Sequence, residues 1–283
     1  MKICNSIDEI RAACRVAKRD GKIVGLVPTM GALHEGHLSL VRAAKAQCGL
    51  VVVSIFVNPL QFGPSEDLAN YPRDFDRDRD LLEKEGVDLI FALRVEEMYP
   101  AAAVTYVTVE GLSDKLCGRS RPGHFRGVTT VVTKLFHIVA PDRAFFGQKD
   151  AAQSAIIRRM VRDLNMPVEI VVCAIVREPD GLAMSSRNAY LDASLRKSAL
   201  VLQRALAAVQ ERFDQGERDV LALVGVGKQT FAREPSVRLD YFEIVDPETL
   251  DPVSDLSRGG LVAVAAFVGK ARLIDNIVLA EAE

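Results

Sequence analysis

Short runs of branched apolar residues alternate with helical stretches along the first 175 residues of this chain, and this alternation restricts the fold more than any other feature. The runs are residues 23–27, 50–57, 87–91, 142–146 and 168–172. Continuous apolar runs of about four to eight residues are typical of strands buried on both faces, as in parallel sheets. The alternation therefore predicts an α/β domain with a Rossmann-like, doubly wound parallel sheet.

Other stretches of the same region carry local signals. Residues 104–109 alternate between apolar and polar side chains, which predicts a strand at the edge of the sheet. Ser6 followed by Glu9 matches the capping box and predicts a helix that Gly21 ends. Residues 73–86 mix charged and apolar side chains and predict a solvent-facing helix.

Four aspartates stand at alternate positions in the predicted helix over residues 73–86. Alternate residues of a helix point to different faces, so these carboxylates cannot converge on one metal ion. We therefore expect a solvated acidic face. The four residues are Asp74, Asp76, Asp78 and Asp80.

The alternation of strands and helices ends near residue 176. Beyond it the pattern predicts helices over residues 193–213 and 219–232 and strands over residues 238–245, 260–268 and 274–280. Helices followed by strands are typical of an α+β domain with an antiparallel sheet. We therefore expect two domains, a Rossmann-like domain over residues 1–175 and a smaller α+β domain over residues 176–283.

The composition excludes several classes of function. The chain has 283 residues, of which 49% are hydrophobic and 26% charged, enough for two unequal domains. A net charge of −2 without a basic block argues against nucleic acid as a partner. Five cysteines without C-x-x-C spacing do not indicate disulfides or a zinc site. Because the sequence has no apolar run of about 18 residues and no secretory leader, we expect a cytoplasmic protein with no membrane partner.

Two histidines follow the first apolar run at a tight turn. Residues 28–31 form the turn, and His34 and His37 come shortly after it. In an open parallel sheet, ligands bind beyond the carboxyl ends of the strands, where a helix start offers backbone N–H groups and a positive dipole end. Histidines three residues apart lie on one helical face, with about 5–6 Å between their Cβ atoms. The stretch therefore predicts a phosphate site, which Gly36 leaves open to a ligand.

Two other interpretations of the histidines stay open. One takes them as solvated side chains with a capping role. The other takes them as a zinc pair, although helical zinc ligands usually stand four residues apart, with a further ligand elsewhere. No G-x-G-x-x-G follows a strand and no P-loop motif occurs, so the usual nucleotide fingerprints give no support.

Three further loops contain candidate site residues. The long loop over residues 58–72 follows the second apolar run, and Asn58 and Gln61 become candidates unless it is a surface loop without a role. Residues 116–127 are rich in glycine and basic side chains, which suits an anionic ligand. Residues 147–150 repeat the order of strand, glycine turn and helix start, now with a lysine.

Five motifs in this order resemble those of the pantoate–β-alanine ligase family, the pantothenate synthetases. They are PTMGALHEGH, SIFVNPLQF, RPGHFRGVTTVV, FFGQKD and AMSSRNAYLD. The residues His34-Glu35-Gly36-His37 also resemble the histidine-any-glycine-histidine signature of the wider nucleotidyltransferase superfamily. Met184 to Arg187 resemble its second, KMSKS-type signature. One signature alone is weak, whereas five ordered motifs are specific.

The resemblance implies an enzyme that condenses (R)-pantoate with β-alanine at the expense of ATP. It implies a pantoyl-adenylate intermediate and the release of AMP and pyrophosphate. ATP is then a substrate, with Mg²⁺ bridging its phosphates, and a homodimer is the implied assembly. The chemistry of the candidates agrees, because positioned donors and cations stabilise the charge that builds on phosphate oxygens.

The resemblance also implies roles for individual residues. Catalytic roles fall to His37, His34 and Lys149, with His37 as proton donor. ATP-binding roles fall to Met30, Gly31, Ala32, Leu33, His34, Glu35, Gly36, His37, Gly147, Gln148, Lys149, Asp150, Val176, Met184, Ser185, Ser186 and Arg187. Pantoate-binding roles fall to Gln61, Gln153, Asn58, Arg121 and His124, with Tyr71 nearby, and Gln61 also binds β-alanine.

Two departures and two rival functions accompany this interpretation. Gln148 stands where the family mostly has glutamate, and Ala152 stands beside Gln153 where the family often has a glutamine pair.

A nucleotidyltransferase that adenylates or cytidylylates a phosphorylated small molecule would share both signatures. A non-catalytic nucleotide-binding regulator would share ATP binding alone.

Overall fold

The computed structural model of the protein describes residues 1–64, 66 and 68–280. The chain forms two compact units, each made of three stretches. The parallel-sheet unit contains Met1–Ser113, Arg121–Gly147 and Ile156–Ala174, and the antiparallel-sheet unit contains Asp114–Ser120, Gln148–Ala155 and the chain from Ile175 on. The sequence predicts a single division after residue 175. In the structure, two short segments before that point, Asp114–Ser120 and Gln148–Ala155, belong to the antiparallel-sheet unit.

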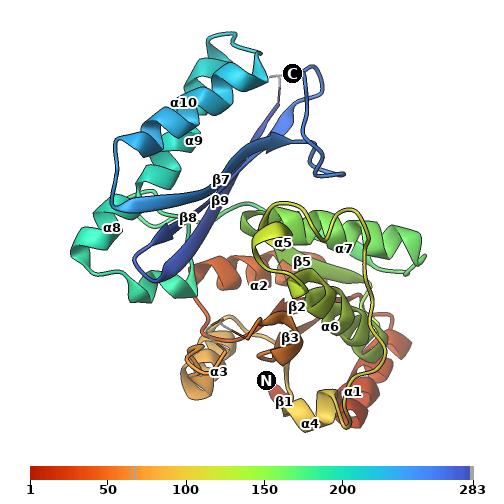
Figure 1. The fold of residues 1–283 in the computed structure, drawn as a ribbon. Coiled ribbons are helices and arrows are strands. Elements are labelled where there is room, and N and C mark those ends of the chain that lie inside the picture. Colours follow the sequence, from red (N-terminus) through yellow and green to blue (C-terminus); the bar gives the residue numbers. More distant parts are fainter. Residues whose placement is uncertain (65, 67, 281–283) are drawn as a thin grey trace. The chain divides into compact units, whose positions relative to one another are not determined.

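Six parallel strands form the sheet of the first unit, which confirms the predicted fold class (Figure 1). They are β1 (Lys2–Cys4), β2 (Val24–Thr29), β3 (Leu50–Ile55), β4 (Leu89–Ala92), β5 (Arg143–Gly147) and β6 (Glu169–Cys173), in the spatial order β1-β4-β3-β2-β5-β6. The chain leaves β2 in one direction across the sheet and later returns to β5 on its other side. The strand order therefore reverses between β2 and β5, which is where doubly wound sheets bind ligands.

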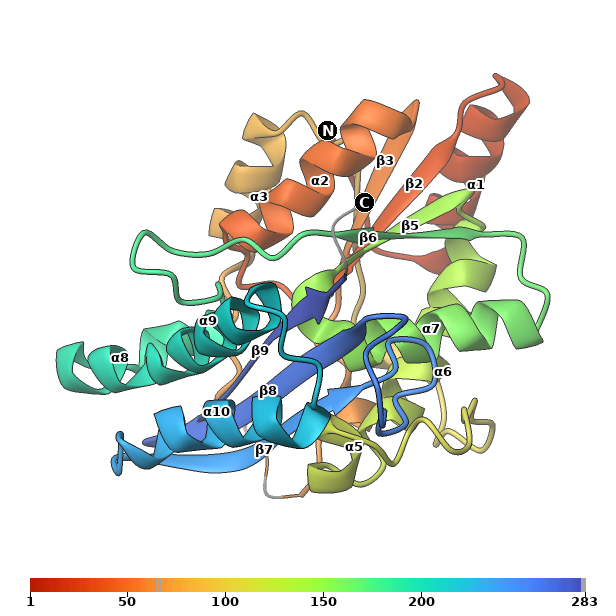
Figure 2. The same ribbon diagram turned by 90° about the horizontal axis from the view of Figure 1, so that it is seen from above.

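Helices cover both faces of this sheet (Figures 1 and 2). The helices of this region are α1 (Ile7–Arg19), α2 (Glu35–Gln47), α3 (Phe75–Lys84), α4 (Val95–Met98), α6 (His124–Val139) and α7 (Ala151–Asp163), and η1 (Pro59–Gln61) is a short 3₁₀ turn. Apolar side chains of α2 and α3 share one core with Val27, Val51 and Val53 of the strands. Helices α1 and α6 contact each other, and α1 begins with the predicted capping box of Ser6 and Glu9.

Residues 104–109 do not form the predicted strand. The backbone N–H of Val107 donates to the Thr130 hydroxyl at 3.0 Å, and its carbonyl accepts from the Thr129 hydroxyl at 2.6 Å. Threonines of α6 therefore provide the hydrogen bonds that a neighbouring strand would have supplied. Val104 is 88% exposed, so the alternating pattern does not mark a buried face. The edge strands are instead β1, which is only three residues long and pairs with β4, and β6, which pairs with β5.

The second unit packs helices on a three-stranded antiparallel sheet, as predicted. Its strands are β7 (Val237–Val245), β8 (Gly260–Val268) and β9 (Ala271–Leu279), and its helical segments are α5 (Cys117–Ser120), η2 (Gln148–Asp150), η3 (Ser186–Tyr190), α8 (Ala193–Ala199), α9 (Val201–Asp214) and α10 (Val220–Ala232). The predicted single helix over residues 193–213 is two helices, because Leu200 leaves the helical ladder with ψ of −11°. Cys117 of α5 places its thiol 3.2 Å from the Tyr241 hydroxyl of β7. Among the described helices, none has the length and apolarity needed to cross a membrane.

Two glycines of α10 stand in opposite environments. A Cβ atom at Gly227 would lie 2.2 Å from ring atoms of Phe242, whereas a Cβ atom at Gly225 would meet nothing within 4 Å. The Phe242 ring is 2% exposed and is enclosed in the core of this unit. Close packing of α10 on β7 therefore depends on the missing side chain at Gly227.

We predict opposite effects for the same substitution at these two positions. Gly225→Ala should stabilise the protein by about 0.5–1 kcal/mol, because alanine loses less backbone entropy in a helix. Gly227→Ala should destabilise it by about 1–3 kcal/mol, because the methyl group overpacks the core against Phe242. Urea unfolding midpoints measure both changes, and equal shifts for the two variants would contradict the proposed packing.

Candidate functional site

The turn after β2 is held by a buried carboxylate from α3. Gly31 and Ala32 both adopt the left-handed conformation, with φ of 81° and 51°. The backbone N–H groups of Ala32 and Leu33 each donate to the Asp78 carboxylate at 2.8 Å. Burial raises the pKa of Asp78, although these two hydrogen bonds oppose the shift. Thr29 completes the turn, because its hydroxyl accepts from the Gly31 N–H at 3.2 Å.

The prediction that Asp78 belongs to a solvated acidic face is wrong, because its side chain is 1% exposed. Asp76 and Asp80 do lie in solvent, where both pair with Arg79. The sequence contains a signal for the exception. Leu82 stands four residues after Asp78, on the same helical face, and is fully buried. Within the described residues, no group of three or more His, Cys, Asp or Glu side chains is arranged to hold a metal ion.

His34 and His37 come together at the start of α2. The Nδ1 atom of His34 accepts from the Gly36 N–H at 3.1 Å, and the Nδ1 atom of His37 accepts from the His34 N–H at 3.3 Å. Their ring centroids are 4.2 Å apart. Because Nδ1 accepts in both rings, each neutral ring carries its proton on Nε2. His34 therefore caps the helix, and both rings offer an Nε2–H donor where the helix dipole is positive.

Asn58 is an interior support of this region. Its side chain is 1% exposed. Its Nδ2 donates to Gln61 Oε1 at 3.0 Å and to the Gly127 carbonyl at 3.1 Å. Its Oδ1 accepts from the Leu60 N–H at 3.3 Å and from the Tyr99 hydroxyl at 2.9 Å. Since these bonds use both donors and both lone pairs of the amide, Asn58 positions Gln61 and has no hydrogen bond left for a ligand.

Gln61 keeps a donor that a ligand can take. Its Nε2 lies 3.3 Å from the Met30 sulfur, which is a weak acceptor that a carboxylate outcompetes. Its backbone carbonyl accepts from His124 Nδ1 at 2.8 Å, and His124 Nε2 lies 3.0 Å from Arg121 Nη1. Because a carbonyl only accepts and a guanidinium only donates, His124 is neutral with its proton on Nδ1. Arg121 and His124 therefore hold the backbone of Gln61 in place.

Arg121 is neutralised by a residue that the sequence analysis missed. Its guanidinium binds both carboxylate oxygens of Glu66, at 2.6 and 2.8 Å. Burial alone would raise the pKa of Glu66. The hydrogen bonds and the charge of Arg121 have the larger effect in the opposite direction, so the pKa of Glu66 is lowered overall. The basic loop is therefore less cationic than its sequence suggests. Glu66 lies in the long loop without a motif around it, so no local signal marks it.

The approach of η1 to α6 depends on a glycine. A Cβ atom at Gly127 would lie 2.2 Å from the Leu60 carbonyl oxygen. Glycine at position 127 therefore permits the close packing that brings Gln61 beside α6.

Tyr71, which the resemblance places near pantoate, is buried and packs edge-on against Phe62, with ring centroids 5.8 Å apart.

In the antiparallel-sheet unit, Asn276 of β9 holds the turn that contains Lys149. Its Nδ2 donates to the carbonyl oxygens of Gln148 and Lys149 at 2.9 and 3.0 Å, and its Oδ1 accepts from Gln148 Nε2 at 3.0 Å. One of the two N–H donors of the Gln148 amide is therefore already used by the protein. The ammonium of half-buried Lys149 and the carboxylate of exposed Asp150 have no polar partner in the part of the chain that the structure describes. Lys149 can therefore pair with an anion.

The remaining candidates of this unit lie on α7 and on the segment before η3. Gln153 is half-buried, while its neighbour Ala152 is buried and 7% exposed. The Met184 N–H donates to the Val176 carbonyl at 3.0 Å, which brings those two residues side by side. Ser185 caps η3 by accepting from the Arg187 N–H at 3.2 Å.

The candidates thus fall into two sets, one in each compact unit. The set in the parallel-sheet unit provides neutral donors at a helix start and an amide beside them. The set in the antiparallel-sheet unit provides a lysine ammonium and serine hydroxyls. Apart from the Asp150 carboxylate, the polar groups of both sets suit an anionic ligand, and oriented donors of this kind stabilise charge that develops on phosphate oxygens.

We predict that Asp78→Ala disturbs the turn after β2. The substitution leaves two buried N–H groups without an acceptor, at a cost of about 1–3 kcal/mol for each. Part of this cost is offset because the variant no longer buries a carboxylate. The matched control is Asp76→Ala on the same helix, where the side chain is 80% exposed. That control should change the free energy of unfolding by less than about 0.5 kcal/mol. Denaturant unfolding of both variants measures the difference, and a stable Asp78→Ala protein would contradict this role.

Comparison with known families gives a match over nearly the whole chain. A family model described as "Pantoate-beta-alanine ligase" matches residues 2–278. The pantothenate synthetase of Koribacter versatilis (strain Ellin345) is 60% identical over 279 residues, which span 99% of this chain and 96% of that protein. That of Thermotoga neapolitana is 59% identical over 279 residues, which span 99% of this chain and all of that protein.

Solved structures match the fold as well. Pantothenate synthetase from Thermus thermophilus superposes with a TM-score of 0.92 at 50% identity, covering 98% of this chain and 99% of that one. Pantoate-beta-alanine ligase from Francisella tularensis, in complex with beta-gamma ATP and beta-alanine, has a TM-score of 0.78 at 31% identity. That match covers 98% of this chain and 97% of the Francisella chain.

Proposed function

This chain belongs to the pantoate–β-alanine ligase family, and from that membership we propose that it condenses (R)-pantoate with β-alanine at the expense of ATP. The observation that carries the proposal is the family match over residues 2–278. The Francisella tularensis relative, complexed with beta-gamma ATP and beta-alanine, supports ATP and β-alanine as substrates here. The anion-binding chemistry of both candidate sets agrees with it.

The reaction consists of two displacements. A carboxylate oxygen of pantoate attacks the α-phosphorus of ATP, and pyrophosphate leaves with the electrons of the broken P–O bond. The amine of β-alanine then attacks the carbonyl carbon of the pantoyl adenylate, AMP leaves, and the nitrogen loses a proton. Both steps need positioning and charge stabilisation more than covalent catalysis by the protein.

The donors of the parallel-sheet unit suit the first step. His34 and His37 present Nε2–H groups at the start of α2, and we assign them to phosphate oxygens, with His37 as proton donor. The loop from Met30 to Leu33 leads into that helix start and would line the nucleotide. The dipole of α2 adds to the same stabilisation.

The groups of the antiparallel-sheet unit have complementary roles. The Lys149 ammonium, which has no acidic partner within the described residues, neutralises phosphate charge, and Asp150 holds ribose hydroxyls. Ser185, Ser186 and Arg187 bind the triphosphate. The nucleotide is also contacted by Gly147, Gln148, Val176 and Met184, and the bond to Asn276 fixes the orientation of the Gln148 amide.

Recognition of the acid rests on two glutamines. Gln61 donates from Nε2 to pantoate and also receives β-alanine, while Gln153 provides a second pantoate contact. Asn58, Arg121 and His124 position Gln61, as their hydrogen bonds indicate. This differs from the sequence-based expectation, in which Asn58, Arg121 and His124 bind pantoate themselves.

Mg²⁺, a homodimer and a cytoplasmic location complete the proposal. The groups assigned to the phosphates are donors and cations, and no cluster of three or more His, Cys, Asp or Glu side chains that could hold a metal occurs among the residues described. Mg²⁺ keeps several waters and binds phosphates readily, so it would enter with ATP and neutralise phosphate charge. The homodimer rests on the family resemblance, and light scattering tests it. The cytoplasm is where ATP is available to the enzyme.

We predict AMP release that requires pantoate, β-alanine and ATP together. Each substrate omitted in turn should abolish AMP formation, and pantoate alone should support exchange of pyrophosphate into ATP. A protein that binds ATP without pantoate-dependent exchange would be a regulator. Transfer to a phosphorylated small molecule in place of pantoate would identify a nucleotidyltransferase.

We predict that His37→Ala lowers the single-turnover rate by about a hundredfold or more, as for loss of one positioned transition-state donor. The matched control is His137→Ala, which removes an exposed histidine on α6. The control should keep the rate of the unmodified protein, because that side chain lies outside the candidate site. An unchanged rate in His37→Ala would remove His37 from the mechanism.

A further inference from the structure

The serine segment consists of Ser185, Ser186 and Arg187 and directly follows a short hairpin of the antiparallel-sheet unit. The hairpin begins at Val176, turns at Gly181, which has φ of +93°, and returns to Met184. Arg177 anchors it to β9 through a bidentate pair with the buried Asp275, at 2.6 and 3.0 Å. The base of the segment is therefore fixed to the sheet.

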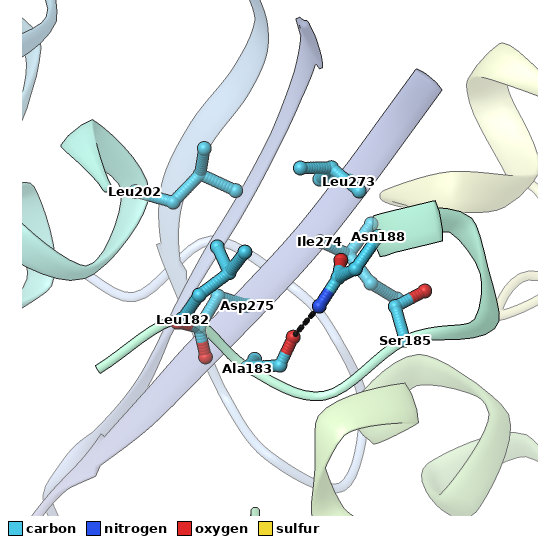
Figure 3. Close-up of a pocket in the computed structure, with 8 residues that line it drawn as sticks. All are labelled: Leu182, Ala183, Ser185, Asn188, Leu202, Leu273, Ile274 and Asp275. Carbon is cyan, nitrogen blue, oxygen red and sulfur yellow. Dashed lines mark hydrogen bonds between the residues drawn. The ribbon is translucent and has the colours of Figure 1, made fainter. Parts of the chain in front are cut away.

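Asn188 closes the other end of the segment onto this hairpin. Its Nδ2 donates to Glu178 Oε1 at 2.7 Å and to the Ala183 carbonyl at 3.1 Å. Its backbone N–H donates to the Ser185 carbonyl at 3.0 Å. The side-chain amide of Asn188 therefore joins the two ends of the serine segment (Figure 3).

The orientation of that amide is determined by its neighbours. Both partners of Nδ2 are acceptors, so exchanging the oxygen and nitrogen of Asn188 would set oxygen against oxygen. Figure 3 shows Nδ2 directed at the Ala183 carbonyl and Oδ1 directed away from it. Oδ1 is buried without a protein donor in the described chain and lies beside a cavity of about 10 Å³ between Leu182, Leu202 and Leu273.

The acceptor that holds Asn188 is itself fixed by a cation. Arg196 of α8 donates to Glu178 Oε2 at 2.5 Å and to Asp180 Oδ2 at 2.8 Å. Glu178 therefore bridges a helix and the serine segment with its two oxygens. A carboxylate that accepts from an amide gives a stronger bond than a neutral acceptor would.

We propose that Asn188 is a positioning residue that holds Ser185, Ser186 and Arg187 in the arrangement that binds the triphosphate of ATP. The inference rests on the proposed function, because it takes the ligand of those three residues from it. Asn188 acts through the loop and does not touch the nucleotide. A purely stabilising role explains the arrangement less well, because a buried amide oxygen without a donor costs stability that an apolar side chain would not lose.

The test compares ATP binding with pantoate binding in Asn188→Ala. Opening the loop should raise the Kd for ATP, measured by calorimetry, and the KM for ATP by about tenfold or more, as for a lost hydrogen bond to a charged group. The KM for pantoate should stay within about twofold of the unmodified protein, since Gln61 is untouched. An unchanged Kd for ATP overturns the proposal, and so does an equal loss for both substrates.

Further variants keep the test decisive if Asn188→Ala does not fold. Asn188→Asp has the same shape but no N–H to donate, so it should show the same selective loss. Glu178→Gln keeps an oxygen that accepts from Asn188 and should retain ATP affinity, whereas Glu178→Ala should not. Asp180→Asn is the matched control, because it changes the other partner of Arg196 and leaves the bond between Glu178 and Asn188. Loss of ATP affinity in Glu178→Gln and Asp180→Asn alike would overturn the role of this amide.

The binding experiment separates this inference from the proposed reaction. If the unmodified protein binds ATP but forms no AMP with pantoate and β-alanine, the reaction is wrong, while a selective loss of ATP affinity in Asn188→Asp still supports the positioning role. If AMP forms and Asn188→Asp binds ATP normally, the reaction stands and the positioning role is wrong.

Discussion

The bond between the Asp78 carboxylate and two backbone N–H groups is the constraint on which the rest of the candidate site depends. It fixes Ala32 and Leu33 and so sets the direction in which the chain leaves β2 and enters α2. The two left-handed residues before α2 lie outside regular secondary structure, so the Thr29 hydroxyl holds the Gly31 N–H and the Asp78 carboxylate holds the Ala32 N–H. Burial disfavours the charged form of Asp78 and raises its pKa. The hydrogen bonds from the two N–H groups offset part of this cost. The placement of the histidines therefore depends on a carboxylate from a different helix, α3.

The same division between binding groups and supporting groups recurs at Gln61. Its side chain is held by the amide of Asn58, and its backbone by the ring of His124, which in turn is fixed by the pair of Arg121 and Glu66. Each supporting bond also fixes a protonation state or an amide orientation. Side chains held in this way are ordered before a ligand arrives, which reduces the ordering that binding has to supply.

The sequence predicts those parts of the molecule that depend on local periodicity. The apolar runs give both sheets, and the glycine turn followed by two histidines gives the helix start, because these patterns act within a few residues. Local patterns do not reveal the roles of Glu66 and Asn276, and they reveal only the burial of Asp78 through its spacing from Leu82, since each role is defined by a hydrogen-bond partner far along the chain. Residues 104–109 mislead for the same reason, because threonines of a later helix take the place of a neighbouring strand.

Helix α7 has a consequence for how such a chain can be divided. Its first residues, up to Ala155, group with the antiparallel-sheet unit, and its residues from Ile156 on group with the parallel-sheet unit. A fragment that began at Ile175 would lack the carbonyl groups of Gln148 and Lys149 that Asn276 binds, and the thiol of Cys117 beside Tyr241. During synthesis those partners emerge long before the antiparallel strands that need them. The second unit is therefore not continuous in the sequence, and a fragment that starts at Ile175 would leave the Asn276 amide without the carbonyl groups to which it donates.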